Sequence, residues 1–330
     1  MTSTRPIAVL CGGVGAARFL RALLHVVPAS DITAIVNTGD DTVMHGLHIS
    51  PDLDTVTYTV AEAIDPQRGW GLVDETWQAM GALSRYTTQR PPGSRAGATW
   101  FGLGDRDLAT HLYRTARLAE GACLTEVTKE ITAAWGLDID ILPMSDDLAP
   151  TRVGVDPAVD PGPDGDGMVP FQDYFVRHHH DIPTRSLDLG ATRAQPTTQV
   201  MTALAEADVV LIAPSNPLVS IGPIRALPEV DAALAARRDT VAAISPLVGG
   251  AALKGPADRM MIEAGFRSDA VGVAECYSAI ASALIIDTVD RNLAPEVLSH
   301  GMEPVVTNTI MADPGVAASL AQITLDAARP

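Results

Sequence analysis

The stretch IAVLCGGVG, residues 7–15, decides the fold of this chain. Its first four residues form a short apolar run, which is typical of a buried strand, and glycines follow at once. Residues 16–26 then carry apolar side chains at helical spacing, and a second apolar run at 32–36 leads into Asn37-Thr38-Gly39-Asp40-Asp41. The pattern predicts a β-α-β unit. Since parallel sheets bind ligands at the carboxyl ends of their strands, we expect both loops to face one crevice.

The alternation of strands and helices extends along the rest of the chain. Apolar runs that end in polar or proline-containing turns predict strands at 139–142, 209–213, 240–244, 270–273, 283–286 and 304–307. Residues 55–135 are mostly helical in pattern. We therefore expect an α/β fold, a Rossmann-like and mostly parallel sheet flanked by helices, with a largely helical insertion covering the crevice. The expected core comprises residues 1–60 and 195–330, and the expected insertion comprises 61–194.

Composition agrees with this class and limits the ligands. Of 330 residues, 47% are hydrophobic but only 4% aromatic, so the core is built from small aliphatic side chains, as in buried parallel sheets. The formal charge of −17 argues against nucleic-acid and anionic-membrane partners. A small anionic ligand would need backbone N–H groups, a few cations or a bound metal.

Cysteine usage and hydropathy suggest a location. The three cysteines lie far apart without paired spacing, which indicates reduced thiols. We identify no signal peptide and no apolar run of the roughly 18 residues that a membrane span requires. These features predict a cytoplasmic protein.

The glycine loop is the first candidate site. Gly12, Gly13 and Gly15 place backbone N–H groups at a helix N-terminus without side chains in the way, which suits phosphate. The loop lacks the Lys-Ser/Thr ending of a Walker motif, and the second strand ends in Asn37 instead of the acidic residue that dinucleotide folds use for ribose. The alternative is a tight structural turn.

Four aspartates after the second strand form the second candidate site. Asp40 and Asp41 follow the strand directly, and Asp52 and Asp54 come soon afterwards with i,i+2 spacing. That spacing points two side chains the same way in an extended segment, and carboxylate oxygens suit Mg²⁺ or Ca²⁺. The alternative is that one or two of them cap helices or turns.

Polar turns after the later strands are weaker candidates. They are suited to hydrogen-bonding a base, ribose or phosphate, although such turns are often only structural; the residues concerned are Ser215, Asn216, Ser220, Gly222 and Ser245.

Three further polar features stand apart from those turns. Arg106 offers a fork for phosphate or a carboxylate, and Asp146 lies in a polar turn that suits a structural or a ligand role equally. His178-His179-His180 is interpreted as a solvated loop, because consecutive histidines point in different directions.

The motifs together resemble those of one known family. GGVGAARF (12–19), NTGDD (37–41), ISPDLDT (49–55), LGDRD (103–107), ILPMSDD (141–147), SNPLVSIGPI (215–224), AISPLVGG (243–250) and KGPADR (254–259) occur in the order found in the CofD/FbiA family. Its members are 2-phospho-L-lactate or phosphoenolpyruvate transferases of deazaflavin coenzyme F-420 biosynthesis. The chain looks most similar to the actinobacterial FbiA branch.

The resemblance implies a reaction and its components. It implies a homodimer, a hard divalent metal such as Mg²⁺, and two substrates, the deazaflavin Fo and a guanosine diphosphate-activated three-carbon acid. The terminal hydroxyl of Fo would attack the phosphorus that carries the acid and release GMP. The product would be dehydro-F-420-0 from a phosphoenolpyruvyl donor, or F-420-0 from a 2-phospholactyl donor. The insertion would form part of the deazaflavin cleft.

The resemblance also implies residue roles. The expected catalytic residues are Asp54 and Asp41, and the expected metal ligands are Asp41, Asp52 and Asp54. The expected nucleotide-binding residues are Gly12, Gly13, Gly15, Asn37, Ser215, Asn216, Ser220, Gly222 and Ser245. The expected deazaflavin or substrate contacts are Asp52, Asp54, Arg106 and Asp146.

Two other classes of function are weighed against this one. An NAD-dependent dehydrogenase is disfavoured by Asn37 and by the acidic cluster. A non-catalytic nucleotide-sensing module has less need of four aspartates near a phosphorus.

Overall fold

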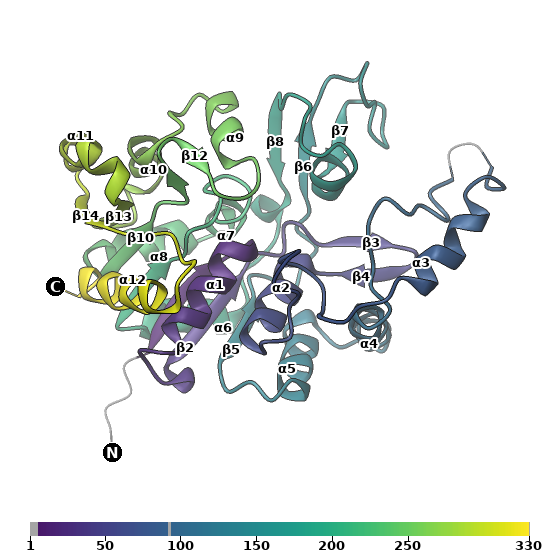
Figure 1. Cartoon of the computed structure of the whole chain (residues 1–330), viewed down its shortest axis with the longest axis horizontal. Coiled ribbons are helices and arrows are strands. Elements are labelled where there is room, and N and C mark those ends of the chain that lie inside the picture. The colour runs from purple at the N-terminus through teal and green to yellow at the C-terminus, as the bar shows by residue number, and fades with distance from the viewer. Residues whose placement is uncertain (1–5, 92–93, 330) are drawn as a thin grey trace.

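A seven-stranded, wholly parallel sheet forms the centre of the molecule in the computed structural model, which describes residues 6–91 and 94–329 (Figure 1). Its strands, from one edge to the other, are β14 (Glu303–Thr307), β13 (Ala283–Asp287), β10 (Val241–Ile244), β9 (Val209–Ile212), β1 (Ile7–Cys11), β2 (Ile32–Val36) and β5 (Asp140–Pro143). The predicted α/β class is confirmed.

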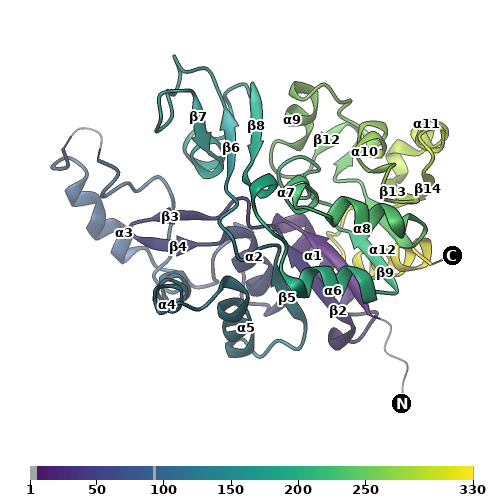
Figure 2. The same ribbon diagram turned by 180° about the vertical axis from the view of Figure 1, so that it is seen from behind.

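The side chains of strand β1 contribute to two hydrophobic cores, one on each face of the sheet. Ile7 and Val9 pack on one face of the sheet, and Ala8 and Leu10 pack on the other, as the alternation of side chains along a strand requires. The first face is covered by α1 (Gly13–Leu23), α2 (Pro51–Val60) and α12 (Pro314–Ala327) (Figure 1). The second face is covered by α6 (Thr198–Glu206), α7 (Gly222–Ala226), α8 (Val230–Ala236), α9 (Ala257–Glu263), α10 (Ala270–Tyr277) and α11 (Ala294–Ser299) (Figure 2).

The middle of the chain adds smaller elements at the carboxyl edge. They are the hairpin β3 (Thr42–Met44) and β4 (Leu47–Ile49), helices α3 (Gln78–Leu83), α4 (Asp107–Ala119) and α5 (Leu124–Ala134), and an antiparallel sheet of β7 (Met168–Pro170), β6 (Thr151–Gly154) and β8 (Ser186–Leu189). Beyond them, β11 (Leu247–Val248) pairs with β12 (Ala251–Ala252), and residues 173–177 form a π-helical turn. Short 3-10 turns occupy 29–31, 84–86, 190–193, 238–240 and 288–293.

The division into a core and an insertion stays a prediction, with two observations that bear on it. Strand β5 comes from the range 61–194 and pairs with β2 in the main sheet, and the sheet β7-β6-β8 lies within the same range. Helix α3 and the hairpin β3–β4 extend away from the main sheet as an arm (Figure 1).

One predicted strand is wrong. Residues 270–273 form the first turn of α10, because the side chain of Asp269 accepts hydrogen bonds from the backbone N–H groups of Val271 and Gly272 and so caps a helix. The helix is buried on nearly every side, so its apolar residues show no helical period that would distinguish it from a strand. Among the helices of the described residues, none is long and apolar enough to cross a membrane.

The topology places ligands between β1 and β9. From β1 the chain runs outward through β2 to β5, then returns to β9 on the other side of β1. Such a switch point leaves a crevice outside the carboxyl ends of the two strands. The loops after β1 and β9 meet there, since a Cβ atom on Gly15 would lie 2.2 Å from the carbonyl oxygen of Pro214.

This contact predicts that Gly15→Ala destabilises the protein. The methyl group would meet a backbone atom that cannot rotate away, so we expect a loss of about 1–3 kcal/mol in the free energy of unfolding, measured by denaturant titration. Gly81→Ala is the control, because its Cβ atom would have no neighbour within 4 Å in the middle of α3. Equal stability of the two variants would contradict the close contact.

Candidate active site

A cavity of about 700 Å³ occupies the crevice at the switch point. Its walls come from the glycine loop, the start of α2, the turn after β9, the loop around β12 and the segment 171–180. Ten of the residues to which a site role was assigned line the cavity: Gly12, Gly13, Gly15, Asn37, Asp52, Asp54, Ser215, Asn216, Ser220 and Ser245. Asp40, from the predicted acidic cluster, lines it as well.

The glycine loop brings bare backbone to the cavity. A Cβ atom on Gly12 would lie 2.6 Å from the Cβ atom of Ser220, and Gly13 has a φ of +69°, which favours glycine. Gly12 has no side chain with which to cap α1; the carboxylate of Asp52 lies beside this turn, with Oδ2 3.0 Å from where a Cβ atom of Gly12 would be, and the N–H group of Gly13 stabilises its charged form. Ser215 fixes the loop from the other side by donating a hydrogen bond of 2.8 Å to the carbonyl oxygen of Gly12. The arrangement suits a phosphate group.

The acidic residues are almost fully buried, and Asp52 lies directly against the glycine loop. Asp40, Asp52 and Asp54 expose only 6 to 8% of their surface. Burial, and then the charge of Asp52, raise the pKa of Asp40 well above its ordinary value. Burial likewise raises the pKa of Asp52 to about 6, although Asn37 opposes the shift by donating a hydrogen bond of 2.9 Å to its carboxylate. Several negative charges therefore share a small volume from which water is largely excluded.

A buried arginine neutralises the charge of one of these aspartates, Asp54. Arg114, which is 2% exposed, donates hydrogen bonds from its guanidinium to both carboxylate oxygens of Asp54, one of them over 3.2 Å. Asp54 lies at the start of α2 and Arg114 on α4, so the pair also joins these two helices.

Two neighbours of Arg114 on α4 belong to the same cluster. His111 lies with Nδ1 3.7 Å from Asp54 and Nε2 3.3 Å from Asp107. The hydroxyl of Tyr58 donates a 2.7 Å hydrogen bond to Asp107. Asp107, His111 and Arg114 are spaced i, i+4 and i+7, so they share one face of the helix.

The cluster can be tested for its fitness to hold a metal. Ligand atoms of Asp54, Asp107 and His111 lie within 4.8 Å of one another, as a metal centre requires. However, Arg114 already neutralises Asp54 there, and a divalent cation beside a buried guanidinium is electrostatically costly. By contrast, Oδ1 of Asp40 and Oδ1 of Asp41 are buried and, among the described residues, have no hydrogen-bond partner. Orphaned carboxylate oxygens with raised pKa values are the environment that a hard cation would relieve.

Comparison with known proteins identifies the family. The family model described as 2-phospho-L-lactate transferase CofD matches residues 7–323. The chain belongs to the CofD family.

Its relatives are named for the same kind of chemistry. A phosphoenolpyruvate transferase of Streptomyces griseus is 40% identical over 98% of both chains, and one of Streptomyces avermitilis is 41% identical over 97% of both. The role of this chain is accordingly that of a transferase in F-420 biosynthesis. A UPF0052 protein from Bacillus halodurans shares the fold, with a TM-score of 0.60 and 14% identity over 98% of this chain and all of that one.

Four expected site residues of this CofD-family chain lie away from the cavity wall. Asp41 accepts a 2.7 Å hydrogen bond from Ser50, and Gly222 begins α7. The guanidinium of Arg106 donates to the carbonyl oxygen of Val73 on an exposed surface.

Asp146 is the fourth of these residues. Its carboxylate accepts hydrogen bonds from the N–H and hydroxyl groups of Thr125 and so caps α5. Its assignment to the substrate stays a prediction without a contact that supports it.

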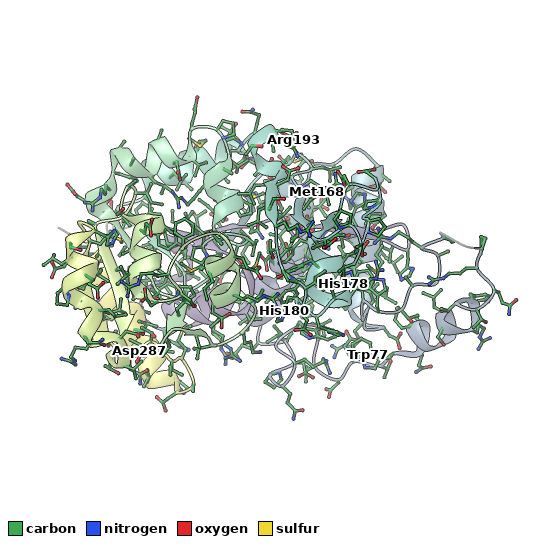
Figure 3. The ribbon with its side chains drawn as sticks, turned by 90° about the horizontal axis from the view of Figure 1, so that it is seen from above. Trp77, Met168, His178, His180, Arg193 and Asp287 are labelled. Atoms are coloured by element: carbon green, nitrogen blue, oxygen red, sulfur yellow. The ribbon has the colours of Figure 1, made fainter. Side chains whose placement is uncertain are left out.

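The prediction of a solvated loop at 178–180 holds only for His179, which is exposed; His178 and His180 contact other side chains. His178 contacts Asp160 over 2.7 Å, and His179 and His180 line the cavity with positive φ angles of 51° and 46°. His180 stacks on Phe175 with ring centroids 5.3 Å apart; Figure 3 labels His178 and His180. An irregular backbone held by tertiary contacts leaves no sequence signal.

The sequence analysis also missed the α4 residues of the site. Their only local signal is the spacing Asp107, His111 and Arg114 on one helical face, and that signal does not name Asp54 as their partner.

The Arg114–Asp54 pair predicts a large effect of Arg114→Met. The variant would leave the Asp54 carboxylate buried without its cation, so we expect a loss of about 3–5 kcal/mol in the free energy of unfolding. Adding Asp54→Asn should recover part of that loss. The control is Arg117→Met on the same helix, whose partners Glu120 and Glu130 are solvent-accessible and whose loss should cost under about 1 kcal/mol. Equal losses for both single variants would contradict the account.

Proposed function

We propose that this protein transfers a phosphoenolpyruvyl group from a guanosine diphosphate-activated donor to the terminal hydroxyl of the deazaflavin Fo, with release of GMP. The observation that carries the proposal is one cavity in which the glycine-rich N-terminus of α1 and a group of buried carboxylates lie together. The first suits a diphosphate, and the second suits a cation and a hydroxyl group that must be oriented. Membership of the family and the names of its relatives support the reaction class.

The nucleotide half of the donor would occupy the switch point. The N–H groups around Gly12, Gly13 and Gly15 would hold the diphosphate. Polar groups at the ends of β9 and β10 and at the start of α7 would contact the guanosine; they are Ser215, Asn216, Ser220, Gly222 and Ser245. In support, the first three and Ser245 line the cavity. Asn37 would act indirectly, because its amide holds Asp52.

A hard divalent cation, Mg²⁺ in this proposal, would be bound at the aspartates. Asp52 and Asp40 are the preferred ligands, because both line the cavity and the second has an orphaned oxygen. Two carboxylates completed by substrate phosphate oxygens and water form a common magnesium site. Asp41 and Asp54 stay further predicted ligands, although Ser50 and Arg114 already bond to them. The bound cation would neutralise charge that develops on the phosphate oxygens.

The residues of the chain would position the reacting groups. The Fo hydroxyl oxygen forms a bond to the phosphorus that bears the acid, and the bond from this phosphorus to the bridging oxygen of GMP breaks. Displacement at phosphorus depends mainly on alignment and charge neutralisation. Asp54 would orient the hydroxyl and receive its proton, because a carboxylate paired with Arg114 retains lone pairs for a further hydrogen bond.

The apolar part of the cavity would receive the deazaflavin ring. Trp70, Phe101, Phe171 and Phe175 line it, and aromatic faces suit a flat heterocycle. A homodimer is proposed from the family resemblance alone.

A transfer assay tests the proposal. The protein is incubated with Fo, Mg²⁺ and either the phosphoenolpyruvyl or the 2-phospholactyl guanosine diphosphate donor, and the products are identified by mass spectrometry. We expect GMP and dehydro-F-420-0 from the first donor, since the relatives carry that name. Stripping divalent cations with EDTA should stop the reaction, and Mg²⁺ should restore it. Nucleotide binding without turnover would support a sensing module and contradict the proposal.

Replacing a proposed ligand should abolish turnover without unfolding the protein. Asp52→Asn removes the charge but keeps the shape, so we expect transfer to fall by about 100-fold or more. Asp138→Asn, on the exposed surface, is the matched control and should retain full activity. A thermal melt confirms that both variants are folded. Wild-type turnover by Asp52→Asn would exclude it as a ligand.

A further inference from the structure

Two cations on the cavity wall have no partner among residues 6–91 and 94–329. Arg18 and Lys254 both line the cavity, and neither makes an ion pair or a side-chain hydrogen bond with the described residues. The other arginine on the wall, Arg68, is paired with Asp65 and lies over the rings of Trp70 and Trp77. Both residues are solvent-exposed, so the lack of a partner is ordinary for each alone; what distinguishes them is that they line the same cavity.

The two cations lie next to the glycine loop. Arg18 is one turn after Val14 on α1, so both residues share a face of the helix. The ammonium of Lys254 lies 2.6 Å from where a Cβ atom of Gly69 would be, and Val14 lies 3.6 Å from the same point. Desolvation, and then the charge of Arg18, lower the pKa of Lys254, as expected if the two charges are near each other.

Gly69 makes this approach possible. Its φ of +75° suits glycine, and a Cβ atom there would require the flexible end of the Lys254 side chain to move. The absence of a side chain at Gly69 therefore leaves room for the ammonium group of Lys254 at the cavity wall. Like charges held together in this way are stabilised when an anion binds between them.

We propose that Arg18 and Lys254 form a subsite for the carboxylate of the three-carbon acid carried by the donor. The inference rests on the proposed function, because it concerns the acid half of that substrate. The donor has two anionic parts. In the proposed function, the N-terminus of α1 and the Mg²⁺ ion bind its diphosphate. Its carboxylate needs a separate site, because the buried aspartates would repel it. An arginine fork and a lysine ammonium are the groups that proteins use for a carboxylate.

The subsite is tested by separating binding of the acid from binding of the nucleotide. Lys254→Met and Arg18→Gln are compared with wild type for the KM of the phosphoenolpyruvyl donor, the KM of Fo, and the Kd of GDP measured by calorimetry. We expect the KM of the donor to rise about tenfold to a hundredfold, which is the loss of one charge-assisted hydrogen bond. The Kd of GDP, which lacks the acid, and the KM of Fo should stay within about twofold of wild type.

Matched controls come from the same helix and the same residue type. Arg21→Gln lies one turn further along α1 in an exposed pair with Glu62, and Lys129→Met replaces the other lysine of the chain, on α5. Both should behave as wild type. Equal loss of GDP and donor binding would mean that the pair binds a nucleotide phosphate, and a changed KM for Fo alone would mean that it binds the acceptor; either result overturns the inference. An unchanged donor KM also overturns it. Absence of turnover by the wild type contradicts the proposed function instead.

Discussion

The burial of several carboxylates in one place is the constraint on which the rest of this structure depends. Asp40, Asp41, Asp52 and Asp54 lie together after the second strand; burial raises the pKa values of the first three, and the charges of neighbouring aspartates add to the shift for Asp40 and Asp41. Only Asp54 has a buried guanidinium, that of Arg114, as its partner. Negative charge at this density is unfavourable by itself, so its presence beside the N-terminus of α1 is informative. A cation would neutralise the carboxylates, and a phosphate ester would then accept hydrogen bonds from the helix N-terminus.

The sheet topology explains why these groups meet. The glycine loop follows β1, Asp40 and Asp41 follow β2, and the serine and asparagine turn follows β9, so three strand ends of a parallel sheet meet at one crevice, to which the first turn of α2 adds Asp52 and Asp54. Helix α4, which belongs to the predicted insertion, places Arg114 within hydrogen-bonding distance of Asp54. The cavity thus combines a nucleotide-binding half that is mostly backbone with a charged half made of side chains. Positioning and charge, rather than a nucleophile, are what phosphoryl-group transfer requires of a protein.

Much of this could be predicted from local sequence. The apolar runs and glycines around β1 and β2 predicted a parallel sheet, and the residues predicted after the strands include several that line the cavity, because strand ends of a parallel sheet meet by geometry. Long-range pairing could not be predicted: Arg114 and Asp54 are 60 positions apart, and no local pattern links them. Residues 270–273 were misassigned because a helix buried all round resembles a strand. His179 and His180 lie on the wall through an irregular backbone that tertiary contacts maintain.

The position of a bound cation tests the central claim most directly. Crystals grown with Mn²⁺ and GDP would locate the ion by its anomalous scattering, independently of turnover. The account predicts a peak at bonding distance from Asp52 and Asp40, completed by a nucleotide phosphate oxygen, with the Arg114–Asp54 pair intact. A peak between Asp54, Asp107 and His111, with Arg114 displaced, would contradict it.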